Sequence, residues 1–416
     1  MHPFLKKLLD GENVEWKPLG EVAEIKRGRR VTKSELIPDG TYPVYSGGVT
    51  PMGRYNKSNQ DKNTITIVKY GTAGFVNFIT EEFWANDVCY CVIPQSTLIN
   101  KFLFYVLTNK QREIYSLVVD AIPAHLPTEE ITNLPIPIPA PNNPEKSLAI
   151  QNEIVRMLDT FTKLISELTR ELGLRKKQYQ YYRDKLLDFK NAADFPFLQK
   201  LLNGAKVEYK PLGEVTTQTK NINWKNTLKT YQYIDLTSVS IETNTILETS
   251  EITAKTAPSR AQKLLEKDDV IFATTRPTQQ RCCVIDEKYD GEIASTGYCV
   301  LRAKKYVALP KWIFYCVTSN NFKKYLEDNQ SGAAYPAISD SKIKEYIIPI
   351  PPIEAQNQIV DILDKFDALT NSLTEGLPKE IELRKKQYAY YRDLLLNFPK
   401  PEPAPVDAGF PKEERC

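Results

Sequence analysis

The chain has 416 residues, of which 42% are hydrophobic, 26% charged and 10% aromatic, and this composition excludes collagen-like, largely disordered and disulfide-framework proteins. Fifty-five lysines and arginines against 52 acidic residues leave a net charge of +3, which argues against a protein that is basic throughout. With two histidines, His2 and His125, mechanisms that need a histidine cluster are disfavoured. Seven cysteines without a C-x-x-C pair indicate reduced thiols rather than a metal site.

The N-terminal residues lack the apolar core of a signal peptide, and no stretch approaches the roughly 20 apolar residues that cross a bilayer. We therefore expect a cytoplasmic protein with no membrane partner.

Residues 7–22 are the first recognisable segment, and they recur at 200–215 with the shared pattern K-L-L-x-G-x-x-V-E-x-K-P-L-G-E-V. A second segment, L-R-K-K-Q-Y-x-Y-Y-R-D-x-L-L-x-F, occurs at 174–189 and again at 383–398. Between them, Q-N-x-I-V and I-P-I-P also occur twice. Such self-similarity indicates two copies of one unit of about 200 residues. The stretches at about 23–130 and 216–340 show almost no match, either because surface loops drifted or because the two copies bind different things.

The unmatched stretches are predicted to mix strands with helices. Residues 64–70, 75–79 and 87–93 alternate or concentrate β-branched and aromatic residues and are predicted strands, followed by a helix at 98–107. In the second copy, residues 269–275 and 297–301 are predicted strands and 311–318 the matching helix. The proline-rich segments at 135–144 and 349–352 are predicted to be short stiff connectors.

Each copy ends in a long predicted helix with a non-polar stripe whose steps alternate between four and three residues, as in a coiled coil. The stripe residues are Ile154, Leu158, Phe161, Ile165, Leu168, Leu172, Tyr179, Tyr182 and Leu186 in the first copy, and Ile359, Leu363, Phe366, Leu373, Tyr388, Tyr391 and Leu395 in the second. We expect the two helices to pair antiparallel as a spacer; separate packing on their own heads is the alternative. Four extra residues near Gly376 and Pro378 predict a kink or break in the second helix.

These elements predict an α+β fold with a pseudo-twofold internal repeat: two globular α/β heads separated by two long helices. The expected boundaries are a first head at 1–146, a helix at 147–190, a second head at 191–352, a helix at 353–398 and a disordered tail at 399–416.

Catalytic motifs are absent from the sequence. It contains neither the glycine-rich S-adenosylmethionine loop and Asn/Asp-Pro-Pro-aromatic motif of a DNA methyltransferase nor a phosphate-binding P-loop. We predict no catalytic residues, no metal ligands and no cofactor in this chain.

Groups suited to nucleic-acid binding are concentrated in the unmatched stretches. Arginine and glutamine can read base edges, and lysine can hold phosphates, although any one such cluster is more often a solvated surface. The candidates are Arg27, Arg29, Arg30, Lys33, Arg54, Lys57, Lys69 and Tyr70 in the first head, and Lys220, Lys225, Arg260, Arg276, Gln279, Gln280 and Arg281 in the second.

The repeated helix motif, the P-L-G-E-V segment and the I-P-x-P-P-x-x-x-Q-x-x-I-V junction at 348–360 resemble the specificity subunit of Type I restriction-modification enzymes over about residues 1–400. The resemblance implies that the heads are two target recognition domains, each reading half of a bipartite sequence in double-stranded DNA. A family pattern close to G-A-x-x-P-A-I matches residues 332–338 and adds Tyr335 as a DNA-binding candidate, whereas residues 120–126, which include His125, depart from it.

The same resemblance implies that the helices dock two methyltransferase (M) subunits, that restriction (R) subunits join them, and that S-adenosylmethionine, ATP and Mg²⁺ belong to these partners. Two other hypotheses remain open. One is a duplicated coiled-coil scaffold that bridges two proteins. The other is a solitary sequence-specific DNA-binding protein.

Overall fold

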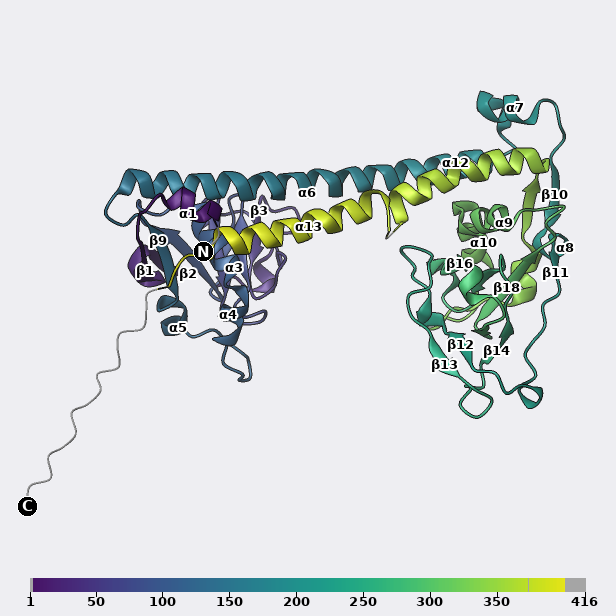
Figure 1. Cartoon of the computed structure of the whole chain (residues 1–416), viewed down its shortest axis with the longest axis horizontal. Coiled ribbons are helices and arrows are strands. Elements are labelled where there is room, and N and C mark those ends of the chain that lie inside the picture. Colours follow the sequence, from purple (N-terminus) through teal and green to yellow (C-terminus); the bar gives the residue numbers. More distant parts are fainter. Residues whose placement is uncertain (1–2, 373, 401–416) are drawn as a thin grey trace, which may run out of the picture. The chain divides into compact units, whose positions relative to one another are not determined.

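A computed structural model describes residues 3–372 and 374–400. Leu373 of the predicted stripe and nearly all of the predicted tail lie outside the described residues. The chain divides into two compact units, residues 1–165 with 384–416 and residues 166–383. Each unit thus combines one head with parts of the long helices (Figure 1). None of the described helices combines the length and apolar composition needed to cross a membrane.

The first unit consists of short helices around small sheets, and it also contains parts of the long helices. Its elements are α1 (Pro3–Leu9), β1 (Val14–Pro18), α2 (Leu19–Val22), β2 (Ala23–Arg27), η1 (Lys33–Glu35), β3 (Tyr42–Tyr45), β4 (Gly53–Tyr55), β5 (Thr64–Val68), β6 (Val76–Ile79), β7 (Trp84–Ala85), β8 (Cys89–Pro94), α3 (Asn100–Asn109), α4 (Gln111–Ser116), α5 (Thr128–Thr132), β9 (Pro135–Pro139), the first part of α6 (Pro144–Leu186) and the second part of α13 (Gly376–Leu395). Its sheets have the strand orders β2-β8-β5-β6, β4-β3-β7 and β1-β9.

The second unit contains the rest of α6 and α13. Its other elements are η2 (Ala192–Asp194), α7 (Pro196–Leu202), β10 (Glu208–Pro211), α8 (Leu212–Val215), β11 (Thr216–Thr217), η3 (Trp224–Asn226), β12 (Tyr231–Ile234), η4 (Leu236–Ser238), β13 (Ser250–Ile252), β14 (Ala261–Leu264), β15 (Val270–Ala273), η5 (Pro277–Gln279), β16 (Cys282–Val284), η6 (Glu287–Tyr289), β17 (Ile293–Ser295), β18 (Tyr298–Ala303), α9 (Pro310–Thr318), α10 (Asn320–Asn329), α11 (Asp340–Glu345), β19 (Ile347–Ile350) and α12 (Ile353–Asn371). Its sheets run β11-β18-β15-β16, β13-β12-β17-β14 and β10-β19.

The two heads share one topology although their sequences hardly match. In each, a four-stranded antiparallel sheet has the same strand order, and a smaller sheet contains one parallel pair, β3 with β7 or β12 with β17. The second head adds β14 to its smaller sheet. In Figure 1, β12, β13 and β14 lie on the side of the second head away from α12. Repetition therefore extends through the whole unit, beyond the segments that sequence matching detects.

The first part of each proline-rich segment is a strand, β9 at Pro135–Pro139 and the end of β19 at Ile347–Ile350, so the prediction that these segments are connectors throughout is wrong. β9 pairs antiparallel with β1, and β19 pairs with β10. Prolines occupy every second position of β9, so the intervening Ile136 and Ile138 are left to donate backbone N–H groups and to point into the core. This ladder places residues 14–18 of the repeated entry segment against residues 135–139.

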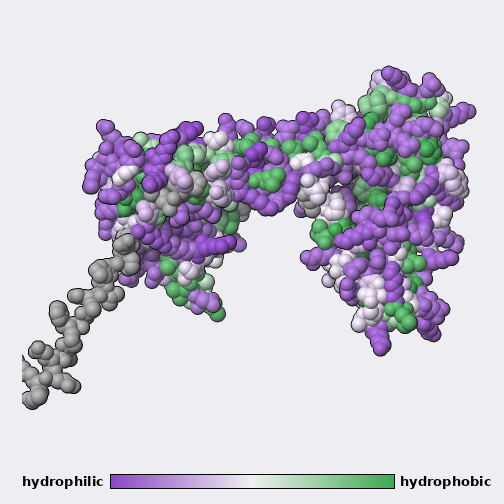
Figure 2. Space-filling model, in the orientation of Figure 1, coloured by the Kyte–Doolittle hydropathy of each residue, from purple (hydrophilic) through white to green (hydrophobic). Residues whose placement is uncertain are grey.

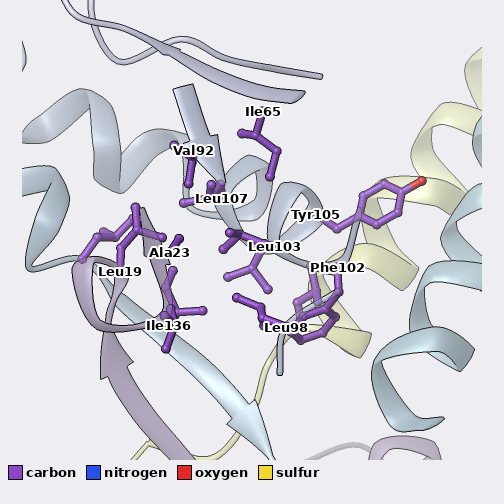
Figure 3. Close-up of a cluster of buried hydrophobic side chains, with 14 of the residues drawn as sticks. Leu19, Ala23, Ile65, Val92, Leu98, Phe102, Leu103, Tyr105, Leu107 and Ile136 are labelled. Atoms are coloured by element: carbon purple, nitrogen blue, oxygen red, sulfur yellow. The ribbon is translucent and has the colours of Figure 1, made fainter. Parts of the chain in front are cut away.

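Helix α3 covers the first head's main sheet. Its buried residues Phe102, Leu103, Val106 and Leu107 recur at the i, i+1, i+4 and i+5 positions of one helix face. Figure 3 shows Leu103 and Leu107 close to Val92 of the sheet, whereas Tyr105 points away from this cluster. Each such side chain contributes on the order of 1.5–3 kcal/mol on full burial.

A buried glutamine joins each head to the helix that follows it. The Gln151 side chain on α6 accepts a hydrogen bond from Ile99 N at 2.7 Å and donates to Thr97 O at 3.1 Å. In the second unit Gln356 on α12 accepts from Leu309 N at 3.0 Å and donates to Val307 O and Pro351 O, both at 2.9 Å. Both amides are fully buried. They therefore fix the start of each long helix against the loop that precedes α3 or α9.

An acidic residue two turns further along each helix completes this attachment. Asp159 pairs with Lys101 at 2.7 Å and accepts a hydrogen bond from the Tyr105 hydroxyl. Asp364 does the same with Lys311, at 2.6 Å, and Tyr315. Burial of Tyr105 and Tyr315 raises the pKa of both phenols, so they remain donors.

Within each unit the long helices pair antiparallel. In the first, the rings of Phe161 on α6 and Tyr391 on α13 stack with centroids 5.3 Å apart. In the second, Tyr179 and Tyr182 on α6 lie against Phe366 on α12, at 6.3 and 6.0 Å. All described residues of the predicted stripe are buried or half-buried. The predicted coiled-coil pairing is confirmed.

Several stripe residues do more than separate the heads, because they belong to the head cores. Ile154, Leu158 and Leu395 lie in the core of the first unit, and Leu186, Ile359 and Leu363 in that of the second. Each head therefore packs against the start of one long helix and the end of the other. Neither a free spacer nor separate packing of each helix on its own head describes this arrangement.

The second long helix is interrupted, as the sequence predicted. α12 ends at Asn371 and α13 begins at Gly376, whose φ of +73° is left-handed. A Cβ atom at this position would lie 2.3 Å from Ala368 O, so only glycine fits here. α6 continues unbroken through Gly173.

Replacement of Gln356 by alanine is expected to lower the free energy of unfolding of the second unit by about 2–4 kcal/mol, because Leu309 N and two carbonyl groups lose buried partners. Calorimetric unfolding of the intact chain measures the change. Gln262→Ala, at a surface bond to Ser259 O, is the matched control and should alter stability by no more than about 0.5 kcal/mol. Equal effects of the two variants would contradict the attachment role.

Candidate nucleic-acid interface

The basic segments of the first head leave its main sheet from one end. β2 ends at Arg27, which pairs with Tyr90, and β5 ends at Val68, which pairs with Cys89. Because Tyr90 and Cys89 are adjacent on β8, the loops that follow β2 and β5 start at the same end of the sheet, on either side of β8. The segments at 27–33 and 69–74 are thus brought together, although some 40 residues of sequence separate them.

Asn86 holds the first of these loops in place. Its side-chain oxygen accepts hydrogen bonds from Val31 N at 3.2 Å and Asp87 N at 2.8 Å, and its amide donates to Val31 O at 2.9 Å. The residue is buried, and Arg29 N adds a bond to Ala85 O at 2.9 Å. Asn86 is not among the residues predicted from the sequence, because no local pattern distinguishes an asparagine that holds a loop in place from one in an ordinary turn.

The basic candidates of the first head divide into two groups. Arg29, Arg30, Lys33 and Lys57 have exposed side chains, and within residues 3–372 and 374–400 no ion pair engages them. Arg54, by contrast, donates to Gly40 O at 2.6 Å and to Thr41 O, so its guanidinium fastens the loop before β3.

Arg27 is intermediate between these groups, with one bond of 3.2 Å to Asp87 O. A cationic group that keeps its donors is available to a phosphate or a guanine edge. Arg27, Arg29, Arg30, Lys33 and Lys57 therefore keep more donors available for DNA than Arg54 does.

Lys69, Tyr70 and His125 form a stacked group at the same end of the head. The ammonium of Lys69 lies 5.4 Å from the ring centroids of Tyr70 and of Tyr90. The rings of Tyr70 and His125 are 5.7 Å apart and inclined by 30°. His125 lies in residues 120–126, which do not match the family pattern. The structure nevertheless places it beside Lys69 and Tyr70, two of the predicted DNA-binding residues.

The corresponding loop of the second head contains Arg276. It follows β15, and Arg276 N donates to Pro336 O at 2.7 Å. The guanidinium lies 5.4 Å from the centroid of the exposed Tyr335 ring. Arg260 is adjacent, because its carbonyl accepts from Thr296 N and Thr274 N donates to Gly297 O, both at 2.8 Å. Arg260, Arg276 and Tyr335 are thus brought to one edge.

Gln280 and Arg281 have structural partners. Both donors of the Gln280 amide bond the end of α9, to Val317 O at 3.2 Å and Ser319 O at 3.1 Å. Arg281 is half-buried and donates to Val239 O. Gln279 is exposed, and its backbone N–H closes the turn onto Arg276 O.

Lys220 and Lys225 are exposed beside β14 rather than on the β15 loop. Leu264 N donates to Lys220 O at 3.2 Å, and Trp224 donates to Ala261 O at 2.8 Å. They flank β14, the strand of the smaller sheet that has no counterpart strand in the first head.

The cysteines of the described residues are buried. Burial raises the pKa of the Cys89 and Cys91 thiols to about 12, and that of Cys299 likewise. Across the part of the chain that the structure describes, no group of three histidine, cysteine or acidic side chains is arranged to hold a metal ion.

Comparisons with known proteins place the chain in a family. The family model described as "Type I restriction modification DNA specificity domain" matches residues 11–174 and 205–383. The Type I restriction enzyme EcoR124I/EcoR124II specificity subunit of Escherichia coli is 34% identical over 426 residues, covering 96% of this chain and 98% of that relative. The EcoprrI specificity subunit of the same organism is 30% identical, covering 89% and 92%.

A solved structure of similar fold is the S subunit of a Type I restriction-modification system from M. genitalium. The TM-score is 0.56 at 19% sequence identity, with 94% of this chain and 98% of that chain covered. At this identity the likeness concerns the fold.

Replacement of Asn86 by alanine is expected to release the loop at 27–33 and to lower stability by about 1–3 kcal/mol, because Val31 N and Val31 O lose their partner. Hydrogen exchange should become faster at residues 29–33 and remain unchanged in β5. Asn56→Ala, at an exposed position of the same head, serves as the control. If hydrogen exchange at residues 29–33 were unaltered in the Asn86 variant, Asn86 would not position this loop.

Proposed function

The chain belongs to the Type I restriction-modification DNA specificity family, and we propose on that premise that each of its heads recognises one half of a bipartite DNA sequence. It is a non-catalytic specificity subunit. One observation carries the proposal. The two heads have the same strand order, but the loops that follow β5 and β15 present different side chains. One frame thus presents Arg29, Arg30 and Lys69 in the first head and Arg276 and Tyr335 in the second.

The charge distribution supports DNA as the ligand of these edges. Exposed arginines and lysines that lack protein partners in the described residues can neutralise phosphates, and arginine can contact guanine O6 and N7 with two hydrogen bonds. The overall charge of +3 does not oppose this role, because the basic groups are concentrated in the loops.

The repeated helix motif supports docking of two identical partners. Leu174 and Tyr181 on α6 are exposed non-polar residues, and so are Leu383 and Tyr390, which occupy the same places in the second motif. Two equal surfaces suit two copies of one protein, and we assign them to the two M subunits. R subunits would join that core, while S-adenosylmethionine, ATP and Mg²⁺ would be bound by the partners.

Adenine methylation provides the direct test. The chain is co-expressed with the M subunit encoded beside it, and methylated adenines are mapped in the host DNA. A single motif with two specified parts and an unspecified gap is expected. Absence of any new methylated motif, or no co-purification with the M subunit, would contradict the proposal. A protein scaffold would instead bind its partners without a steep dependence of DNA affinity on salt.

Replacement of both Arg29 and Arg30 by alanine is expected to weaken specific DNA binding by about 1–3 kcal/mol for each lost base contact, or to lower the salt slope by about one for each lost phosphate contact. Degeneracy should appear in one half of the methylated motif only. Lys7→Ala, an exposed cation on α1, is the control. Loss of specificity in both halves, or in neither, would argue against separate reading by the heads.

A further inference from the structure

Two hairpins occupy equivalent places in the heads, despite the absence of sequence similarity between them. In the first head Val119 and His125 exchange backbone hydrogen bonds of 2.9 and 3.2 Å, and in the second Ser331 and Ala337 exchange bonds of 2.9 and 2.8 Å. The residue after each hairpin then donates to the loop after the central strand, Leu126 N to Lys69 O and Ile338 N to Thr274 O, both at 2.9 Å. The bonding therefore aligns residues 119–126 with 331–338.

Both hairpins expose a large non-polar side chain close to their tip. Ile122 is fully exposed, at 104% of its reference area, and Tyr335 is 72% exposed. The loop that protrudes from the first unit beyond α4 is coloured as hydrophobic in Figure 2, and Tyr115 and Val119 are exposed there as well. Burial of such side chains in a partner is favourable. Tyr335 lies beside the Arg276 guanidinium, and the first hairpin is bonded to the Lys69 loop through Leu126 N.

Arg276 adopts a backbone conformation that is unfavourable for arginine. The same bonding pattern aligns it with Gly71, and both have positive φ, +49° and +95°. Glycine adopts positive φ without cost, whereas any other residue is strained in this conformation. Such backbone strain is often retained at functional sites. In this conformation Arg276 N bonds Pro336 O, and the guanidinium lies over the Tyr335 ring.

We propose that the two hairpins contact equivalent parts of their half-sites and that Ile122 and Tyr335, which are one position apart in the aligned hairpins, insert as non-polar wedges against a base step. The inference rests on the proposed function. Wedge side chains that enter a base step partly unstack it, and neighbouring cations hold the phosphates on either side. Arg276 is placed for that second task beside Tyr335, and its guanidinium also orients the ring. In the first head, Lys69 lies in the loop to which the hairpin is bonded.

Exposure alone does not distinguish Tyr335, because Tyr306 is 80% exposed in the same unit. Tyr306 follows β18, which ends at Ala303, whereas the Arg276 loop begins where Ala273 pairs with Tyr298 at the start of that strand. The two tyrosines therefore lie beyond opposite ends of the sheet. Tyr306 provides a matched control of the same residue type.

The test uses the complex with its M subunit and duplexes that carry the mapped motif. Tyr335→Ala is expected to weaken binding about tenfold, an effect typical of one lost stacking contact, without changing the salt slope. Tyr335→Phe should bind as the wild type does, because the ring and not the hydroxyl makes the contact. Arg276→Ala should lower the salt slope by about one. Tyr306→Ala should change neither quantity.

Unstacking is measured with 2-aminopurine placed at successive positions of each half-site other than the methylated adenine. Fluorescence should rise at one step per half-site, and the rise should be lost with Tyr335→Ala in one half and with Ile122→Ala in the other. Wild-type affinity and fluorescence in both alanine variants would overturn the inference. Failure of the wild-type complex to bind the motif would instead contradict the proposed function.

Discussion

Gln151 and Gln356 have fully buried amides that bond backbone groups of the head on one side while their own backbone belongs to a long helix. A buried amide without partners is costly, so the loop before α3 or α9 and the following helix must keep one relative position. The carboxylates of Asp159 and Asp364 add a second point of attachment two turns later. Two such points fix the orientation of a head on its helix as well as its position.

The opposite end of each helix is attached by different groups. Arg392 on α13 donates to the Asn109 side chain at 3.1 Å in the first unit, and Asp184 on α6 accepts from the Asn320 amide at 2.6 Å in the second. The repeated Y-Y-R-D sequence is thereby explained as a joint between a helix end and a head. Because these bonds join the long helices to α3, α9, α10 and the residues just before α3 and α9, the loops that follow β5 and β15 can change without loss of the attachment.

Those loops show why counting basic residues is insufficient to define an interface. Arg54, Gln280 and Arg281 occur in the same sequence clusters as Arg30 and Arg276, yet their donors bond backbone carbonyls of the fold. Whether a basic side chain is free or bonded to the fold depends on which strand end or helix end lies near it. The local sequence does not reveal this. The hairpin at 119–125 is a case where a signal existed, because Leu126 precedes Ile136 by the same ten residues that separate Ile338 from Ile348.

By itself the sequence determined the duplication, the antiparallel helices, the helix break near Gly376 and the concentration of cations in the unmatched stretches. Each of these features depends on the spacing or composition of residues along the chain, which can be read directly from the sequence. Only the tertiary structure decided that the proline-rich segments begin as strands, that the heads share one topology, and that Lys69, Tyr70 and His125 meet. These features depend on hydrogen bonds between residues distant in sequence, and many different side chains can accompany the same backbone pairing.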